Sequence, residues 1–128
     1  MRYTDDMTDR TSIENWVARY RVAWESNEPD DIRALFTPDG VYYTGPSEEP
    51  WRGHDDIVAK WLESADQPGE TSYENLGVLA VDGDLGVVQL RVDYREGRYY
   101  DNIWLIELDD DGRARSFTEW YMKRPEGA

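Results

Sequence analysis

The sequence predicts a single α+β domain, in which helices come first and an antiparallel sheet follows. Its length of 128 residues fits one domain and is enough to bury a core. Apolar residues recur at helical spacing in the first half, whereas from Thr71 onward they alternate with polar residues, as in half-buried strands. Each break between the later segments carries a glycine beside an acidic residue, which is typical of hairpins.

Three helices are expected within the first 65 residues. Residues 11–14 (TSIE) have the pattern of a capping box that opens the first helix. The apolar face of this helix is predicted to consist of Ile13, Trp16, Val17, Tyr20 and Trp24. A second, shorter helix has Pro29 in its first turn and is predicted to end at a turn over residues 37–40. A third helix is predicted over residues 54–65, and its inward-facing residues are Ile57, Val58, Trp61 and Leu62.

One short strand, over residues 41–44, is predicted between the second and third helices. A loop rich in glycine and proline follows over residues 45–53. Four longer strands are predicted over residues 71–81, 85–95, 98–108 and 113–123. We expect residues 1–10 to form a flexible arm and residues 11–125 to form the domain.

The chain is strongly acidic, with 28 acidic and 14 basic residues and a formal net charge of −14. Such a charge repels phosphate backbones and anionic lipids, so neither nucleic acid nor a membrane surface is expected as a partner. The chain has no cysteine, which excludes disulfides and thiolate zinc sites, and no metal or cofactor motif is recognisable. The first residues lack the apolar segment of a signal peptide, so a cytoplasmic location is expected.

Three segments carry a resemblance to a known family. They are residues 34–41 (ALFTPDGV), residues 53–57 (GHDDI), and residues 111–113 (DGR) followed by 117–121 (FTEWY). With the order of elements over about residues 12–124, these segments resemble the SnoaL-like proteins of the nuclear transport factor 2-like superfamily. The resemblance implies a cone-shaped α+β barrel, with three N-terminal helices packed on a curved antiparallel sheet. It also implies a cavity for a small, largely apolar molecule and a homodimer formed through the sheet.

The superfamily includes isomerases, polyketide cyclases, dehydratases and epoxide hydrolases, as well as domains that only bind or dimerise. Two functions are therefore expected from the resemblance: a cofactor-free acid/base enzyme, or a non-catalytic ligand-binding or dimerisation domain. The dimer is expected to use apolar strand residues, which are Val88, Leu90, Val92, Ile103 and Trp120.

Paired carboxylates offer a route to acid/base chemistry on the predicted sheet. Strand alternation places Arg91 and Asp93 on one face of their strand, and it places Glu119 on the same face as Tyr121. Two hairpins lie between these strands. If the loops of both hairpins have an even number of residues, or both have an odd number, Arg91, Asp93 and Glu119 converge on one face. If one number is odd and the other even, Glu119 lies on the opposite face from Arg91 and Asp93. In a converged group the arginine would keep one carboxylate ionised as a base, and burial would favour a proton on the other.

This group resembles the site of the limonene epoxide hydrolase branch of the superfamily. By that resemblance, residues 91–93 (RVD) match an Arg-x-Asp pair, and Glu119 replaces a later aspartate. Tyr42 matches a tyrosine that holds the attacking water, and Thr44 replaces an asparagine with the same role.

The ketosteroid isomerase branch fits less well. Tyr20 falls where its oxyanion-hole tyrosine would lie, but Thr44 occupies the position of its base. Trp104 occupies the position of its protonated carboxylic acid, where an indole N–H could still donate a hydrogen bond.

The candidate residues can be grouped by role. The candidate catalytic residues are Arg91, Asp93, Glu119 and Tyr42. The candidate ligand-binding residues are Tyr20, Thr44, Trp51, Trp104 and Tyr121, with Trp51 as a lid over the cavity or an interface anchor. Structural alternatives remain: Arg91 and Asp93 also fit a surface ion pair, and Tyr20 also fits a core residue of its helix.

Overall fold

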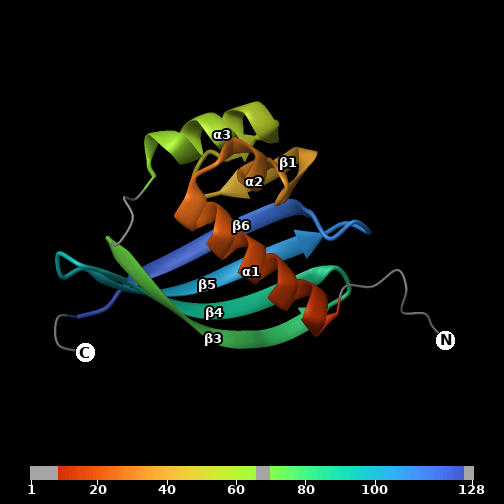
Figure 1. Cartoon of the computed structure of the whole chain (residues 1–128). Helices are drawn as coiled ribbons and strands as arrows, with labels where there is room; N and C mark the ends of the chain where they lie inside the picture. The colour runs from red at the N-terminus through yellow and green to blue at the C-terminus, as the bar shows by residue number, and fades with distance from the viewer. Residues whose placement is uncertain (1–8, 66–69, 126–128) are drawn as a thin grey trace.

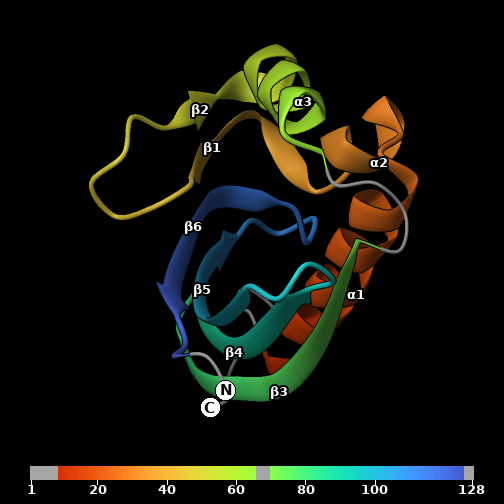
Figure 2. The same ribbon diagram turned by 90° about the vertical axis from the view of Figure 1, so that its left-hand side faces the viewer.

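The computed structural model, which describes residues 9–65 and 70–125, shows three helices packed against one curved sheet (Figure 1). The helices are α1 (Arg10–Ser26), α2 (Pro29–Arg33) and α3 (Gly53–Glu63). The strands are β1 (Phe36–Tyr43), β2 (Trp51–Arg52), β3 (Thr71–Asp82), β4 (Leu85–Tyr94), β5 (Tyr99–Leu108) and β6 (Ala114–Lys123). They form one sheet in the order β2-β1-β6-β5-β4-β3, which curls into an open cone with α1 along its inner side (Figure 2). The predicted α+β class is confirmed.

Helix α1 begins slightly earlier than the sequence pattern indicates. Its N-cap is Asp9, whose carboxylate accepts a hydrogen bond from the Ser12 backbone N–H at 2.8 Å, so the capping box predicted over residues 11–14 is wrong. Arg10 therefore lies in the helix, and residues 1–8 of the expected arm are outside the described residues. The predicted apolar face of this helix is buried except for Trp24, which is partly buried and packs against the core.

The turn predicted over residues 37–40 is wrong, because these residues belong to strand β1. The pairing of β1 with β6 shifts register between Phe36 and Val41, and Pro38 lies within that irregularity. Proline has no N–H to donate to a strand ladder and is tolerated at such shifts, so a sequence typical of a turn occurs here inside a strand. Part of the predicted loop over residues 45–53 also differs, since Trp51 and Arg52 form β2.

The four strands predicted in the second half are confirmed to within two residues at each end. Neighbouring strands of the sheet are antiparallel, except that β1 and β6 run parallel. Glycines with positive φ lie in the breaks between strands, as at Gly83, Gly97 and Gly112. Strand β3 is irregular as well as long, because its register with β4 shifts on both sides of Gly77.

The core lies between α1 and the inner face of the sheet. Val88, Leu90 and Val92 of β4 are buried there, so they cannot form the expected dimer contact, whereas Ile103 and Trp120 are register partners on the outer face. These three valine and leucine side chains alternate with the more exposed, odd-numbered positions of β4, which is the pattern of a sheet that is covered on one side. Leu62, predicted to face inward, is 42% exposed, so the buried face of α3 is narrower than predicted and consists of Ile57, Val58 and Trp61.

Candidate functional site

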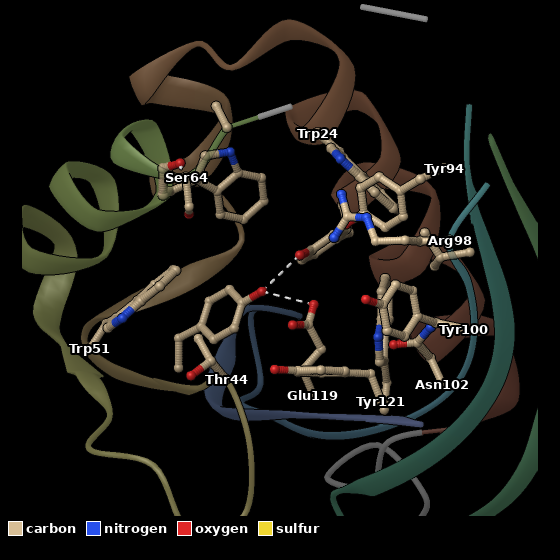
Figure 3. A pocket seen from close by; sticks show the side chains of 16 residues that line it. Trp24, Thr44, Trp51, Ser64, Tyr94, Arg98, Tyr100, Asn102, Glu119 and Tyr121 are labelled. Carbon is tan, nitrogen blue, oxygen red and sulfur yellow. Dashed lines mark hydrogen bonds between the residues drawn. The ribbon is translucent and has the colours of Figure 1, made fainter. Parts of the chain in front are cut away.

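A cavity of about 380 Å³ lies between the inner face of the sheet and helices α1 and α3 (Figure 3). Its aromatic walls come from distant segments of the chain: α1, β1, β2, α3 and the three strands β4 to β6. The lining residues are Tyr20, Trp24, Tyr42, Thr44, Trp51, Trp61, Ser64, Ala65, Val92, Tyr94, Arg98, Tyr100, Asn102, Trp104, Glu119 and Tyr121. The tyrosine and tryptophan rings thus surround a space and do not fill it, as a binding site for a small, largely apolar molecule requires.

A chain of three hydrogen-bonding side chains links α1 to the cavity. The Tyr42 hydroxyl donates to Glu119 Oε1 at 3.1 Å, and its oxygen is 2.9 Å from the Tyr20 hydroxyl (Figure 3). Because Tyr42 has one hydroxyl proton and gives it to Glu119, Tyr20 must be the donor to Tyr42. Strand β1 brings Tyr42 to this position through its parallel pairing with β6, in which Tyr42 lies opposite Phe117.

The environment of Tyr42 strongly favours its protonated form. Burial raises the pKa of Tyr42 well above its ordinary value, and the neighbouring charge of Glu119 raises that pKa further. Tyr42 therefore stays a hydrogen-bond donor to the carboxylate at neutral pH. A carboxylate that accepts a hydrogen bond in this way is held in position while it faces an aromatic cavity.

Two buried nitrogen atoms of the cavity wall have no hydrogen-bond partner among the described residues: Trp104 Nε1 and Asn102 Nδ2. Both side chains line the cavity, and Trp104 and Asn102 are only 1% and 4% exposed. They lie two residues apart on β5, so strand alternation directs them to the same face. Trp104 is also the register partner of Glu119 on β6, which puts a donor and a carboxylate side by side.

Of the two arrangements that the sequence left open, the structure shows the one in which Arg91 and Asp93 are separated from Glu119. Asp93 pairs with Tyr99, so the face of Arg91 and Asp93 continues through the odd-numbered residues of β5. Glu119 pairs with Trp104, so its face continues through the even-numbered ones. One hairpin therefore has an odd and the other an even number of loop residues, which leaves Arg91 and Asp93 on the outer face of the sheet.

On that outer face both residues form surface ion pairs. Arg91 Nε lies 3.2 Å from Asp101 Oδ1, and Asp93 pairs with Arg124, which also approaches Asp101. The side chains of Arg91 and Asp93 are 47% and 45% exposed. The structural interpretation of these two residues therefore holds, and the epoxide-hydrolase-like group that needs them in the cavity is not assembled.

The other predicted site residues all lie at the cavity. Tyr42 and Glu119 are hydrogen-bonded to each other, and the five predicted ligand-binding residues are all lining residues. Trp51 lies on the short strand β2, with its ring centroid 4.6 Å from that of Tyr42, and so forms part of the wall. Tyr20 is buried in the core of its helix and also lines the cavity, where its hydroxyl lies 2.9 Å from that of Tyr42.

Sequence reasoning did not single out several lining residues as site residues. Asn102 was detectable in principle, because strand alternation places it on the same face as Trp104. Arg98 gave no such signal, since it lies in the hairpin between β4 and β5. There its guanidinium stacks 4.2 Å from the Tyr94 ring and pairs with Glu96, at the exposed side of the cavity.

His54 and the acidic residues form no metal-binding cluster within residues 9–65 and 70–125. His54 Nε2 is 2.8 Å from the Phe36 carbonyl oxygen, so the imidazole connects the start of α3 to β1. Within the same described ranges, no helix has the length and apolar character that a membrane span needs.

The fold and the cavity define a class of protein: a helix-covered, cone-shaped sheet with a polar group at the bottom of an aromatic pocket. The family model for the SnoaL-like domain matches residues 17–122, and the chain therefore belongs to the SnoaL-like family. Among proteins of curated function, none matches this chain.

Two of the solved structures that share the fold illustrate the likeness. An NTF-2 like protein of unknown function from Burkholderia xenovorans LB400 is similar with a TM-score of 0.71 and 16% identity, over 92% of this chain and 88% of that one. A "putative ketosteroid isomerase" from Kribbella flavida DSM 17836 is similar with a TM-score of 0.71 and 18% identity, over 94% of this chain and 85% of that one. At this level of identity the likeness shows the fold alone.

Proposed function

We propose that this protein is a cofactor-free acid/base enzyme that acts on a small, largely apolar molecule, with Glu119 as the group that moves the proton. The observation that carries this proposal is the carboxylate of Glu119 at an aromatic cavity, held by a hydrogen bond from the buried Tyr42 hydroxyl. The name of the Kribbella flavida relative points to the same general class of chemistry.

The chemistry follows from the hydrogen bonds. The Glu119 carboxylate would accept a proton from a carbon atom of the bound molecule and return it to another position, so the protein is unchanged after the reaction. Tyr42 would keep its own proton and hold the Glu119 oxygen in place throughout. A bound molecule between the aromatic walls would displace water from the reacting atoms, which would strengthen the electrostatic effect of the carboxylate.

Proton exchange provides a direct test. Cyclic ketones and epoxides of a size that fits the cavity would be incubated with the protein in D2O, and the loss of C–H signals would be followed by proton NMR. We expect exchange or turnover of at least one ketone, a loss of about a hundredfold or more in Glu119→Gln, and partial recovery in Glu119→Asp. Epoxide hydration is not expected, since Arg91 and Asp93 lie outside the cavity.

Matched controls come from the outer face of the sheet. Arg91→Gln and Asp93→Asn remove charged groups from the outer face of the same sheet and do not alter the cavity. Both variants should therefore leave the rate of proton exchange unchanged. Equal rates in the protein and in Glu119→Gln would rule out the proposed role of Glu119. Binding without any exchange or turnover would instead support the second function, a non-catalytic ligand-binding domain.

A further inference from the structure

Arg98 brings a positive charge to the cavity of a strongly acidic protein. Among the lining residues that the structure describes, Arg98 and Glu119 are the two that carry a charge, so the charges of the cavity wall cancel although the chain has a net charge of −14. Glu119 accepts a hydrogen bond from the buried Tyr42 hydroxyl, whereas the Arg98 side chain is 47% exposed. The cavity thus has a negative group at its inner part and a positive group at its exposed side (Figure 3).

The hairpin between β4 and β5 fixes the position of Arg98. The Tyr94 N–H donates to the Arg98 carbonyl oxygen at 2.7 Å, and the Gly97 N–H donates to the Tyr94 carbonyl oxygen at 2.9 Å. Continued by one pair, the register of β4 with β5 sets Arg98 opposite Tyr94, on the inner face of the sheet. The Arg98 side chain therefore points into the cavity, where its guanidinium carbon lies 4.2 Å from the centroid of the Tyr94 ring (Figure 3).

The guanidinium of Arg98 has two binding edges, and Glu96 occupies one of them. The Nε and Nη2 atoms of Arg98 both contact Oε1 of Glu96, which therefore lies at the edge that these two nitrogens form. Neither contact involves Nη1, so the second edge, formed by Nη1 and Nη2, is not used by Glu96. Because the guanidinium is stacked on the Tyr94 ring, its N–H groups point sideways, and this second edge matches the two oxygens of a planar carboxylate.

We infer that Arg98 binds a carboxylate group of the substrate, and that the substrate is a largely apolar ring compound with one such group. The rings of Tyr94, Tyr100 and Tyr121 form a row across β4, β5 and β6, with centroid separations of 5.8 and 5.7 Å. This row runs from the Arg98 hairpin to the strand that carries Glu119, and it offers contact to the ring of a bound molecule. A phosphate group fits less well, because its second negative charge is opposed by the net charge of −14.

This inference rests on the proposed function, since it takes the cavity as the place of the substrate, and it adds the class and the orientation of that substrate. Glu119 repels the carboxylate from the inner part of the cavity, and Arg98 attracts it at the exposed side. The apolar part of the molecule then lies among the aromatic walls, on the side of Glu119. The carbon atom that gives up a proton is therefore remote from the carboxylate charge, which would otherwise oppose the removal of that proton.

The test compares 2-naphthoate with 2-naphthamide, a neutral compound of nearly the same shape, by calorimetric titration of the full chain at neutral pH and low ionic strength. We expect naphthoate to bind about fivefold more tightly, a modest factor because Arg98 is partly exposed. Arg98→Gln should remove this preference, and about 1 M sodium chloride should weaken it. The matched control is Arg95→Gln, which removes the same charge from the same hairpin at a residue that does not line the cavity. It should retain most of the preference.

Glu96→Gln is a second variant, and its expected effect is a gain. It removes the negative charge that shares the guanidinium with the ligand, so the affinity for naphthoate should rise about two- to threefold while that for naphthamide stays the same. A damaged fold cannot produce such a gain. Equal affinity for both compounds, binding of neither, or a preference that persists in Arg98→Gln would overturn the inference. Glu119→Gln should abolish proton exchange and keep the preference for naphthoate, so a failure of the proposed function and a failure of this subsite give different results.

Discussion

Tyr42 makes the stability of the protein depend on pH in a predictable direction. Burial raises the pKa of Tyr42 well above 10, so the folded protein keeps this proton at a pH where the unfolded chain loses it. The stabilisation from the protonated phenol is therefore fully present below about pH 10 and is lost as the pH rises above that value. The free energy of unfolding should fall as the pH rises above about 10, and it should fall less in Tyr42→Phe.

Urea unfolding over this pH range measures both quantities. At neutral pH, Tyr42→Phe should be less stable by about 1–2 kcal/mol, because it removes the shared partner of Tyr20 and Glu119. Tyr121→Phe is the control, since Tyr121 is 55% exposed, and it should show the same pH dependence as the unchanged protein. Parallel pH curves for the protein and Tyr42→Phe would contradict this account.

Two buried polar residues should respond to substitution with opposite signs. Asn102→Leu removes a buried nitrogen that has no partner among the described residues, so we expect a gain in stability of about 1 kcal/mol without ligand. Thr37→Val removes a hydroxyl that donates to Asp39 Oδ1 at 3.2 Å, so we expect a loss of about 1 kcal/mol. The urea midpoints of the two variants, compared with that of the unchanged protein, measure both changes in stability. A loss of stability in Asn102→Leu would indicate that the nitrogen has a structural partner.

Helix α1 approaches strand β4 closely at Gly86. A Cβ atom added at Gly86 would lie 2.5 Å from Ile13 Cγ1, and the Ile13 side chain is fully buried. Gly86→Ala should therefore destabilise the protein by about 1–3 kcal/mol, because overpacking outweighs the roughly 0.5–1 kcal/mol that alanine gains over glycine in a strand. Thermal or urea unfolding provides the measurement.

The double variant Gly86→Ala with Ile13→Val separates crowding from other causes. Valine lacks the Cδ1 atom that would meet the new methyl group, so the double variant should lose less stability than the two single variants added together. Strict additivity would show that the effect of Gly86→Ala does not arise at Ile13.

The positions of the hairpins could be predicted from the sequence, whereas the register of the strands could not. The hairpin positions follow from glycines beside acidic residues, since a positive φ is needed at a few places only and Gly83, Gly97 and Gly112 provide it. The separation of Asp93 from Glu119 could not be predicted, because it depends on the register of two hairpins and a shift of one residue reverses the faces. The strand conformation around Pro38 could not be predicted either, since it depends on the irregular pairing with a distant strand.

The candidate site was predictable only in part, because its assembly also depends on how distant strands pair. Tyr42, Glu119 and Trp104 could each be named from their strands, but their meeting in one cavity depends on the parallel pairing of β1 with β6. That pairing joins segments more than 70 residues apart along the chain, and no local pattern reports it.

For the whole molecule, we expect a homodimer that forms through the outer face of the sheet. Trp120 and Met122 are 46% and 47% exposed on this face, and Ile103 lies beside Trp120 in the register. Trp120→Asp should therefore reduce the mass in solution from twice 15.0 kDa to 15.0 kDa by light scattering. Val22→Asp changes an equally exposed residue of α1 and should leave the mass unaltered. A 15.0 kDa mass for the unchanged protein would contradict the dimer.

The aromatic walls of the cavity have a practical consequence. Four of the six tryptophans line it, namely Trp24, Trp51, Trp61 and Trp104, while Trp16 is sealed in the core and Trp120 lies on the outer face. Most of the indoles therefore belong to the wall of the cavity, where a bound molecule would change their surroundings. The protein carries its own optical reporter of occupancy, and a library of unlabelled compounds can be screened by the change in emission alone.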